Sequence, residues 1–151
     1  MQNNSFPQRI TVRRGIYKTN PKNIEPYLGE NIKYVGEVNF KEKIKLYNEA
    51  EVMLFPILWN EPFGNVMIES MACGTPVVAS NSTSIPEVTG DAAVLVNPAN
   101  VDEIAEKMLL VIKNERLQEE LREKGLKRAK CFSWRKTAEE TLELYKQVCN
   151  S

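Results

Sequence analysis

Short apolar runs of the kind that form buried strands recur along the middle of this chain, and a stretch of helical pattern separates each run from the next. The runs cover residues 52–56, 76–80 and 92–96, and a looser alternation of apolar and polar residues covers 31–36. Runs that are apolar throughout are typical of parallel strands buried on both faces. Strands that alternate with helices predict parallel β-α-β units. We therefore expect an α/β fold of three layers, with helices on both faces of a parallel sheet.

Helical patterns fill the intervals between these runs. Residues 40–49 place Phe40, Ile44 and Tyr47 on one face of a helix, and residues 66–72 predict a second helix that Gly74 and Pro76 end. After residue 98 the chain is expected to be helical to its end, with apolar stripes that we expect to be buried. The members of these stripes are Ile104, Met108 and Val111, then Leu117 and Leu121, then Trp134, Ala138, Leu142, Tyr145 and Val148.

Weaker local signals concern helix ends and the start of the chain. Ser84, followed three residues later by Glu87, predicts a capping box at the start of a helix. Gly125 predicts an interruption in the helix around it. A first strand is expected at 10–14, and a loop with a short helix at 17–30.

Composition excludes several classes of function. The formal net charge is zero, from 20 basic and 20 acidic residues, which argues against a nucleic-acid partner bound by bulk charge. No apolar run approaches the roughly 18 residues of a membrane span, and the start of the chain lacks the pattern of a signal peptide. The three cysteines predict reduced cytosolic thiols. Histidine is absent, so the commonest metal ligand and general base are missing, and we expect no metal or cofactor in a cytoplasmic protein.

One stretch predicts a ligand site where a buried strand ends and a helix begins. Pro62 and Gly64 fit a turn after the strand, and the first turn of the helix then offers unpaired N–H groups that attract an anion such as a diphosphate. Glu61 and Glu69 lie on either side of this turn. A carboxylate is a pure acceptor and holds vicinal hydroxyls well, so the pair suits the sugars that flank a diphosphate.

The same spacing has a purely structural explanation. A glutamate near the start of a helix stabilises the helix by complementing its dipole. Spacing alone does not decide between the two interpretations.

The residue pattern around the turn adds a resemblance. The segment EPFGNVMIE at 61–69, followed by ACGTPVVA at 72–79, resembles the signature of the retaining GT-B glycosyltransferases of family 4, glycosyl transferases group 1, which carry two glutamates separated by seven residues. Further matching segments fall in the order usual for that family. They are YVGEV at 34–38, LYNEA at 46–50, IPEV at 85–88, GDAA at 90–93 and FSW at 132–134.

The resemblance implies a Rossmann-like carboxyl-terminal domain that binds a nucleotide-sugar donor such as GDP-mannose or UDP-glucose. It implies that Glu69 binds the ribose, and that Glu61 contacts the transferred sugar and is the catalytic residue. Backbone contacts to the sugar and diphosphate are implied for Phe63, Gly64, Asn65 and Val66, and contacts to the nucleobase for Gly36 and Val38.

Two departures from the family pattern shape the expectation. The Arg and Lys that neutralise the diphosphate in the family have no convincing counterpart, and a solvated loop is the simpler role for Arg13, Arg14 and Lys18. The chain also resembles only the donor-binding half. We therefore expect a single domain over 1–151, with residues 1–9 disordered and the amino-terminal acceptor domain missing.

The expected function is hexose transfer, such as mannose or glucose, to the hydroxyl of a glycan or lipid acceptor that the missing domain would bind. The expected location is the cytoplasm, with the full-length enzyme associated peripherally with the membrane. Without a closed cleft this chain alone should transfer sugar poorly, unless an acceptor-domain chain associates with it. The alternative is a non-catalytic nucleotide-binding or assembly module that partners another chain.

Overall fold

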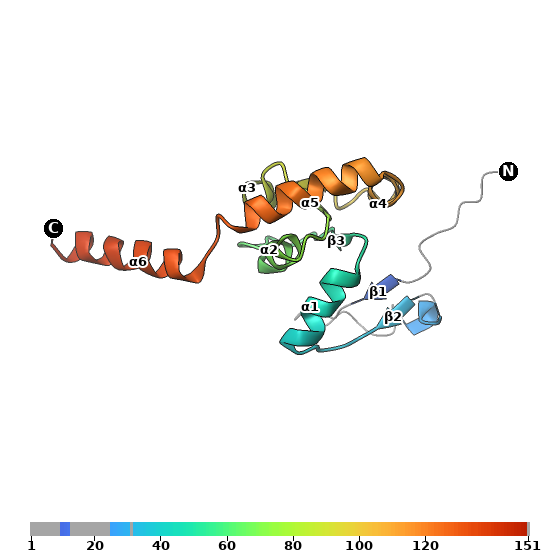
Figure 1. Cartoon of the computed structure of the whole chain (residues 1–151), viewed down its shortest axis with the longest axis horizontal. Coiled ribbons are helices and arrows are strands. Elements are labelled where there is room, and N and C mark those ends of the chain that lie inside the picture. The colour runs from blue at the N-terminus through green and yellow to red at the C-terminus, as the bar shows by residue number, and fades with distance from the viewer. Residues whose placement is uncertain (1–9, 13–24, 31, 151) are drawn as a thin grey trace. The chain divides into compact units, whose positions relative to one another are not determined.

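The computed structural model describes residues 10–12, 25–30 and 32–150 (Figure 1). These residues belong to two compact units divided after Lys43, and each unit is described by itself. The expectation of a single domain therefore stays a prediction. The basic residues Arg13, Arg14 and Lys18, and the expected disorder of residues 1–9, lie outside the described residues.

The first unit contains a small parallel pair of strands. Strand β1 (Ile10–Val12) pairs with β2 (Ile32–Tyr34), with Thr11 opposite Lys33. A short 3-10 helix, η2 (Glu25–Tyr27), lies between them in the sequence. The strand expected at 10–14 and the short helix within 17–30 are confirmed for the residues that the structure describes. The strand expected at 31–36 is confirmed over Ile32–Tyr34, and it ends before Val35.

Helix α1 (Phe40–Glu49) begins in the first unit and continues into the second. It starts at a reciprocal capping box: the Glu42 N–H donates to the Asn39 side chain at 3.1 Å, and the Asn39 N–H donates to the Glu42 carboxylate at 2.9 Å. The predicted helix is confirmed, but its predicted face is buried only in part. Tyr47 is buried, whereas Phe40 at the first turn is 71% exposed.

A three-stranded parallel sheet forms the centre of the second unit. Its order is β3 (Met53–Phe55), β4 (Val77–Ser80) and β5 (Ala93–Val96), with Met53 opposite Val77 and Val77 opposite Ala93. The helices of this unit are α2 (Asn65–Ala72), α3 (Ile85–Thr89), α4 (Val101–Lys113), α5 (Glu115–Ala129) and α6 (Trp134–Cys149). The predicted α/β fold with a parallel sheet is confirmed.

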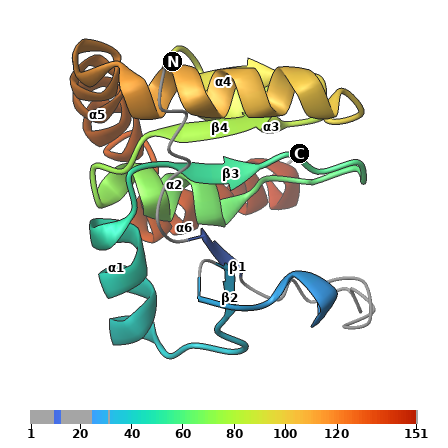
Figure 2. The same cartoon turned by 90° about the vertical axis from the view of Figure 1, so that its right-hand side faces the viewer.

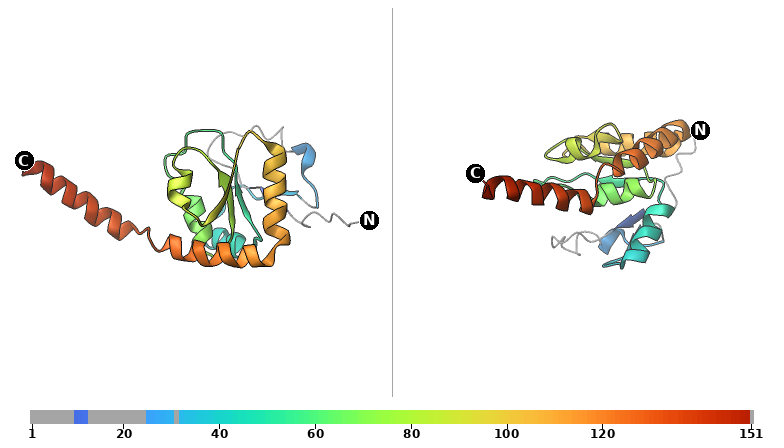
Figure 3. Two further views of the ribbon diagram at one scale, coloured as in Figure 1. Left: turned by 90° about the horizontal axis from the view of Figure 1, so that it is seen from above. Right: turned by 60° about the vertical axis from the view of Figure 1, so that its left-hand side comes forward.

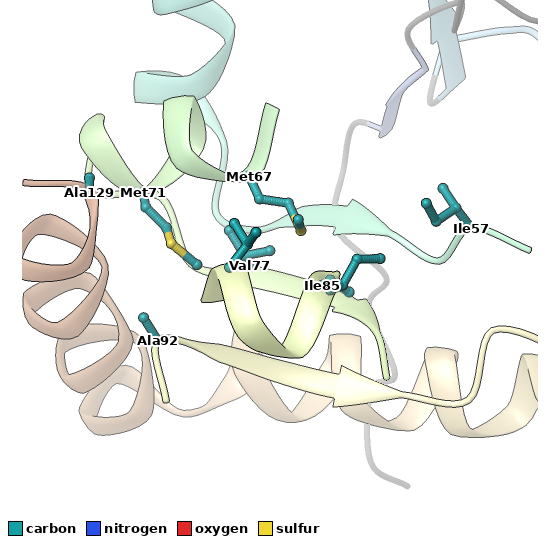
Figure 4. Close-up of a cluster of buried hydrophobic side chains, with 9 residues drawn as sticks. Ile57, Met67, Met71, Val77, Ile85, Ala92 and Ala129 are labelled. Atoms are coloured by element: carbon teal, nitrogen blue, oxygen red, sulfur yellow. The ribbon is translucent and has the colours of Figure 1, made fainter. Parts of the chain in front are cut away.

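The sheet buries a separate apolar cluster on each face, because successive strand residues point to opposite sides. Val77 and Ala79 of β4 face Met67 and Met71 of α2, and Val78 faces the other side. Figure 4 shows the first cluster, in which the side chains of α2, β4 and α3 point toward one another. The second cluster joins Val78 and Val96 of the sheet to Val111 of α4 and Leu121 of α5. Figure 2 shows α4 on one side of the strands and α2 on the other.

Close packing of α5 against α2 corrects one prediction. Helix α5 continues without a break through Gly125, which was expected to interrupt it. A Cβ atom at this position would lie 3.3 Å from Cγ of Met71. Glycine is therefore used here for the close approach of two helices and does not end the helix.

Two further predictions about burial were wrong. Leu54 in β3 is 37% exposed, although the apolar run predicted burial on both faces. It lies at the edge of the three-stranded sheet, while α4 packs over β4 and β5. The stripe on α6 is also exposed: all of α6 is described, and none of its residues is buried. Figure 3 shows α6 extending away from the layers of the second unit.

Candidate functional site

The turn between β3 and α2 depends on Gly64. This residue precedes the helix with φ of 85°, a left-handed conformation that disfavours residues with a Cβ atom. A Cβ at this position would also overlap Cε of Met67, which is fully buried in the core. The sharp turn therefore fits glycine for two independent reasons, and it places the start of α2 directly after the β3 loop.

The start of α2 presents backbone donors. The first backbone bond at this end runs from the Met67 N–H to the Gly64 carbonyl at 3.0 Å. The N–H groups of Gly64, Asn65 and Val66 precede that bond, so helix geometry gives them no partner within the helix. Asn65 is exposed, whereas the side chain of Val66 packs against the core. Donors of this kind, together with the helix dipole, favour an anion.

The Glu61 carboxylate lies on the strand side of this turn and is held by two neighbours. The indole Nε1 of Trp59 donates to its Oε2 at 3.2 Å, and the backbone N–H of Phe63 donates to its Oε1 at 3.4 Å. Trp59 is placed in turn by an edge-to-face contact with Phe55, with ring centroids 6.4 Å apart. A carboxylate has about four acceptor positions, so both oxygens keep capacity for ligand hydroxyls.

The Glu69 carboxylate lies farther along α2 and is held from α1. The hydroxyl of the buried Tyr47 donates to its Oε2 at 3.2 Å. Tyr47 is itself fixed through its backbone, because the Thr75 hydroxyl donates to the Tyr47 carbonyl at 2.6 Å. The two glutamates are therefore oriented by different elements, Glu61 by its own loop and Glu69 by α1.

Phe63 is partly exposed beside the turn. Its ring meets the ring of Phe132 edge to face, with centroids 5.6 Å apart. Gly36 and Val38, predicted to contact the nucleobase, belong to the first unit, where Gly36 has φ of 63°. The structure brings Glu61, Phe63, Gly64, Asn65 and Val66 together around one turn, and it places Glu69 farther along α2, in contact with Tyr47. The assignment of Gly36 and Val38 to the site stays a prediction.

Sequence reasoning missed several residues that shape this site. Tyr47 was predicted only as a core residue, and Trp59 was not singled out. Ser84 was predicted to cap α3, but its side chain makes no cap bond and its Oγ donates to the Glu61 carbonyl at 2.8 Å. The capping box is therefore wrong, because Ser84 has helical φ and ψ and not the extended conformation that a capping side chain needs. No local pattern reports such a contact between segments distant in sequence.

The described residues contain neither a cluster of metal-ligating side chains nor a membrane-spanning helix. No cluster of three or more histidine, cysteine, aspartate or glutamate residues able to hold a metal occurs there. Within the same residues, every helix is too short or too polar to cross a bilayer.

Residues 22–128 match the protein family described as "Glycosyl transferases group 1". Over 115 residues, which cover 76% of this chain and 30% of the relative, the chain is 38% identical to the O-antigen chain mannosyltransferase B of Escherichia coli. It is 37% identical over 112 residues, 72% of this chain and 27% of the relative, to the MMP alpha-(1->4)-mannosyltransferase of Mycolicibacterium hassiacum. The chain thus spans less than a third of the length of either protein.

The fold of the chain also matches that of a solved structure. The sucrose-phosphate synthase of Thermosynechococcus elongatus superposes with a TM-score of 0.76 at 28% identity, over 86% of this chain and 33% of that protein. The family match covers well over half of the chain, and the parallel α/β architecture agrees with it. The chain belongs to the glycosyl transferases group 1, a family with the GT-B fold.

Proposed function

We propose that this chain is the donor-binding domain of a retaining, family 4 nucleotide-sugar glycosyltransferase. The observation that carries the proposal is the turn at Gly64, which presents the backbone donors of α2, with Glu61 before it and Glu69 after it in the chain, each carboxylate hydrogen-bonded to a neighbouring aromatic side chain. In this proposal the diphosphate of the donor binds at the start of α2. The backbone N–H groups at the start of α2 favour an anion, and the two glutamates favour hydroxyl groups. The site therefore suits a ligand with a charged centre and with hydroxyls at both ends.

The two glutamates have different roles in the proposed complex. Glu69, which Tyr47 orients from α1, accepts hydrogen bonds from the ribose hydroxyls. Glu61 accepts hydrogen bonds from the transferred sugar and stabilises the positive charge that develops on it, an electrostatic contribution to catalysis. Gly36 and Val38 of the first unit are proposed to contact the nucleobase.

The proposed reaction breaks the bond between the anomeric carbon and the diphosphate oxygen. A bond from the acceptor hydroxyl oxygen forms at the same carbon and on the same face, and the leaving diphosphate takes the acceptor proton. The relatives named as mannosyltransferases make mannose the first hexose to test, from a donor such as GDP-mannose, with UDP-glucose as the comparison. An acceptor glycan or lipid, and its binding outside this chain, belong to the same proposal.

Calorimetric titration of the chain with GDP, UDP, GDP-mannose and UDP-glucose tests the proposal. We expect saturable binding of one nucleotide and tighter binding of its sugar derivative. Glu69→Ala should abolish both, because the ribose loses its acceptor. Glu61→Ala should lower the affinity for the sugar nucleotide to that for the nucleotide alone.

Glu106→Ala supplies a matched control, since it removes an exposed glutamate of α4. It should leave both affinities unchanged. Absence of heat with every nucleotide would contradict the proposal. It would favour the alternative, an assembly module in which both glutamates only make the internal contacts described above.

A further inference from the structure

The loop that carries Glu61 is tied at both ends to the segment between β4 and α3. The buried hydroxyl of Ser80, the last residue of β4, donates to the carbonyl of Ile57 at 2.8 Å and of Phe55 at 3.3 Å. The hydroxyl of Ser84, directly before α3, donates to the carbonyl of Glu61 at 2.8 Å. Two serines of one segment therefore fix the start and the end of the loop 57–61.

The backbone between these two serines is strained. Thr83 has φ of 57°, and among the described residues it is the one residue other than glycine with a positive φ. A β-branched residue in this region costs of the order of 1–3 kcal/mol and persists only where the surroundings impose it. Ser84 also leaves the helix start without a side-chain cap. The positive φ of Thr83 and the missing cap of α3 both lower the local stability of this segment. In this conformation the Ser84 hydroxyl donates to Glu61 and not to the start of α3.

The other end of α3 is linked to Phe63, which follows the loop 57–61 in the chain. The guanidinium of Arg128 in α5 donates to the carbonyls of Glu87 at 2.6 Å and Val88 at 2.9 Å. It also lies 5.0 Å from the ring centroid of Phe132, which meets Phe63 edge to face. Helix α3 is therefore linked to Glu61 at its start and, through Arg128 and Phe132, to Phe63 at its end.

Glu69 depends on none of these contacts described for the loop. It projects from α2 and accepts its hydrogen bond from Tyr47 of α1. Removing the Ser84 hydroxyl would leave the carbonyl of Glu61 without this bond and free the end of the loop, while α2 keeps its position in the core.

We propose that Ser84 is a positioning residue for the transferred sugar: it fixes the main chain of Glu61, so that recognition of the sugar can be lost while recognition of the nucleotide is kept. The inference rests on the proposed function and deepens it. Ser84 itself touches no ligand in this arrangement, and it acts only through Glu61.

Calorimetry on the chain tests this separation directly. The measured quantity is the ratio of the affinity for a sugar nucleotide to the affinity for the same nucleotide without sugar. Ser84→Ala should lower this ratio by about tenfold, the effect of one lost hydrogen bond on a partly buried acceptor, and leave nucleotide affinity unchanged. Ser84→Thr, which keeps the hydroxyl, should restore the ratio. Ser82→Ala, in the same segment, is the matched control and should behave as the wild type.

A measurement without ligand reports on Glu61 itself. The chain has two tryptophans, and only the indole of Trp59 donates to the Glu61 carboxylate, whereas Trp134 is 81% exposed in α6. In a ¹H–¹⁵N correlation spectrum, Ser84→Ala should shift the indole signal of Trp59 and leave that of Trp134 in place. Trp59→Phe assigns the two signals.

The outcomes separate this inference from the proposed function. A wild-type chain that binds no nucleotide overturns both. A Ser84→Ala variant that keeps the sugar ratio, leaves the Trp59 indole signal unmoved, or loses both affinities equally overturns the inference alone. A wild-type chain that binds nucleotide without any gain from the sugar overturns the inference and also contradicts the role proposed for Glu61.

Discussion

Helices α5 and α6 are neighbours in sequence and similar in length, 15 and 16 residues, yet their surroundings differ completely. Leu121, Gly125 and Ala129 of α5 are buried against the rest of the second unit. None of the residues of α6, each of them described, is buried. Both helices carry an apolar stripe of helical period, so the stripe alone does not determine which helix is buried.

The face of α5 that meets α2 differs from the stripe of α6 in side-chain size, although α5 also buries Leu121 in the second apolar cluster. Helix α5 meets α2 through small residues, and Gly125 allows the backbone of α2 to approach until Met71 fills the space above it. The stripe of α6 consists instead of large side chains, among them Trp134, Leu142 and Tyr145, each at least 55% exposed. Small residues on one helix let another helix lie close, whereas a stripe of large residues requires a surface shaped to receive it.

The largest expected effect follows from removing the side chain that fills the space between α2 and α5. Met71→Ala should lower the free energy of unfolding by about 2–5 kcal/mol, because Met71 is fully buried and its loss leaves a cavity. Urea denaturation followed by circular dichroism measures the change. A loss below about 1 kcal/mol would mean that α5 closes the cavity and that its packing is not close.

Adding a side chain on α5, opposite Met71 of α2, should change the free energy of unfolding less. Gly125→Ala improves helix propensity by about 1 kcal/mol, but the new Cβ would lie 3.3 Å from Cγ and 3.5 Å from Cα of Met71. Because the fully buried side chain of Met71 must then move by a few tenths of an ångström, we expect a net destabilisation of about 1 kcal/mol. Lys127→Ala, at an exposed position of the same helix, is the control and should change stability by less than about 0.5 kcal/mol. A more stable Gly125→Ala variant would show that the two helices have room between them.

The contrast between α5 and α6 also shows what the sequence could predict: local signals were readable, whereas the packing of whole elements was not. Strands β3, β4 and β5 follow from their apolar runs, and the start of α2 follows from Gly64 and the flanking glutamates, because these signals are local. The exposure of Leu54 depends on which strands α4 covers, and the role of Ser84 depends on a carbonyl 23 residues away in the chain. Burial and contacts between distant segments are set by the packing of whole elements, so neither the apolar stripe of α6 nor the Ser84–Glu87 spacing reveals them.

Ion pairs extend the comparison to the surfaces of the two helices. Lys124 of α5 contacts Glu120 within the helix at 2.8 Å and Asp91 outside it at 3.3 Å. On α6, by contrast, Arg135 pairs with Glu139 within the same helix. The hydrogen bond and charge of Lys124 hold the pKa of Glu120 below its usual 4.5, and the hydrogen bonds to Glu120 and Asp91 raise the pKa of Lys124 above 10.5.

The sign of each shift gives a pH window for a small effect. The lowered pKa of Glu120 contributes stability above pH 4.5 that is lost as the pH falls through the folded-state value, and the raised pKa of Lys124 contributes stability below pH 10.5 that is lost as the pH rises through it. Lys124→Met should therefore lower the free energy of unfolding slightly between pH 4.5 and pH 10.5, and its effect should be smallest at more acidic and more alkaline pH. Because the groups are exposed, about 1 M salt should reduce the difference. Thermal unfolding over pH at two salt concentrations measures it, and a deficit unaffected by salt would contradict a pair exposed to solvent.

The smallest effect is expected on α6. Leu142→Ala removes a large apolar side chain that is 55% exposed, and alanine has the higher helix propensity, so the two consequences nearly cancel. We expect a change in the free energy of unfolding of less than about 0.5 kcal/mol, measured by urea denaturation beside Met71→Ala. Lys146→Ala, on the same helix, controls for the change in propensity. A loss near that of Met71→Ala would mean that Leu142 is packed in solution against a surface as well shaped as the one α2 offers to α5, and the contrast between the two helices would disappear.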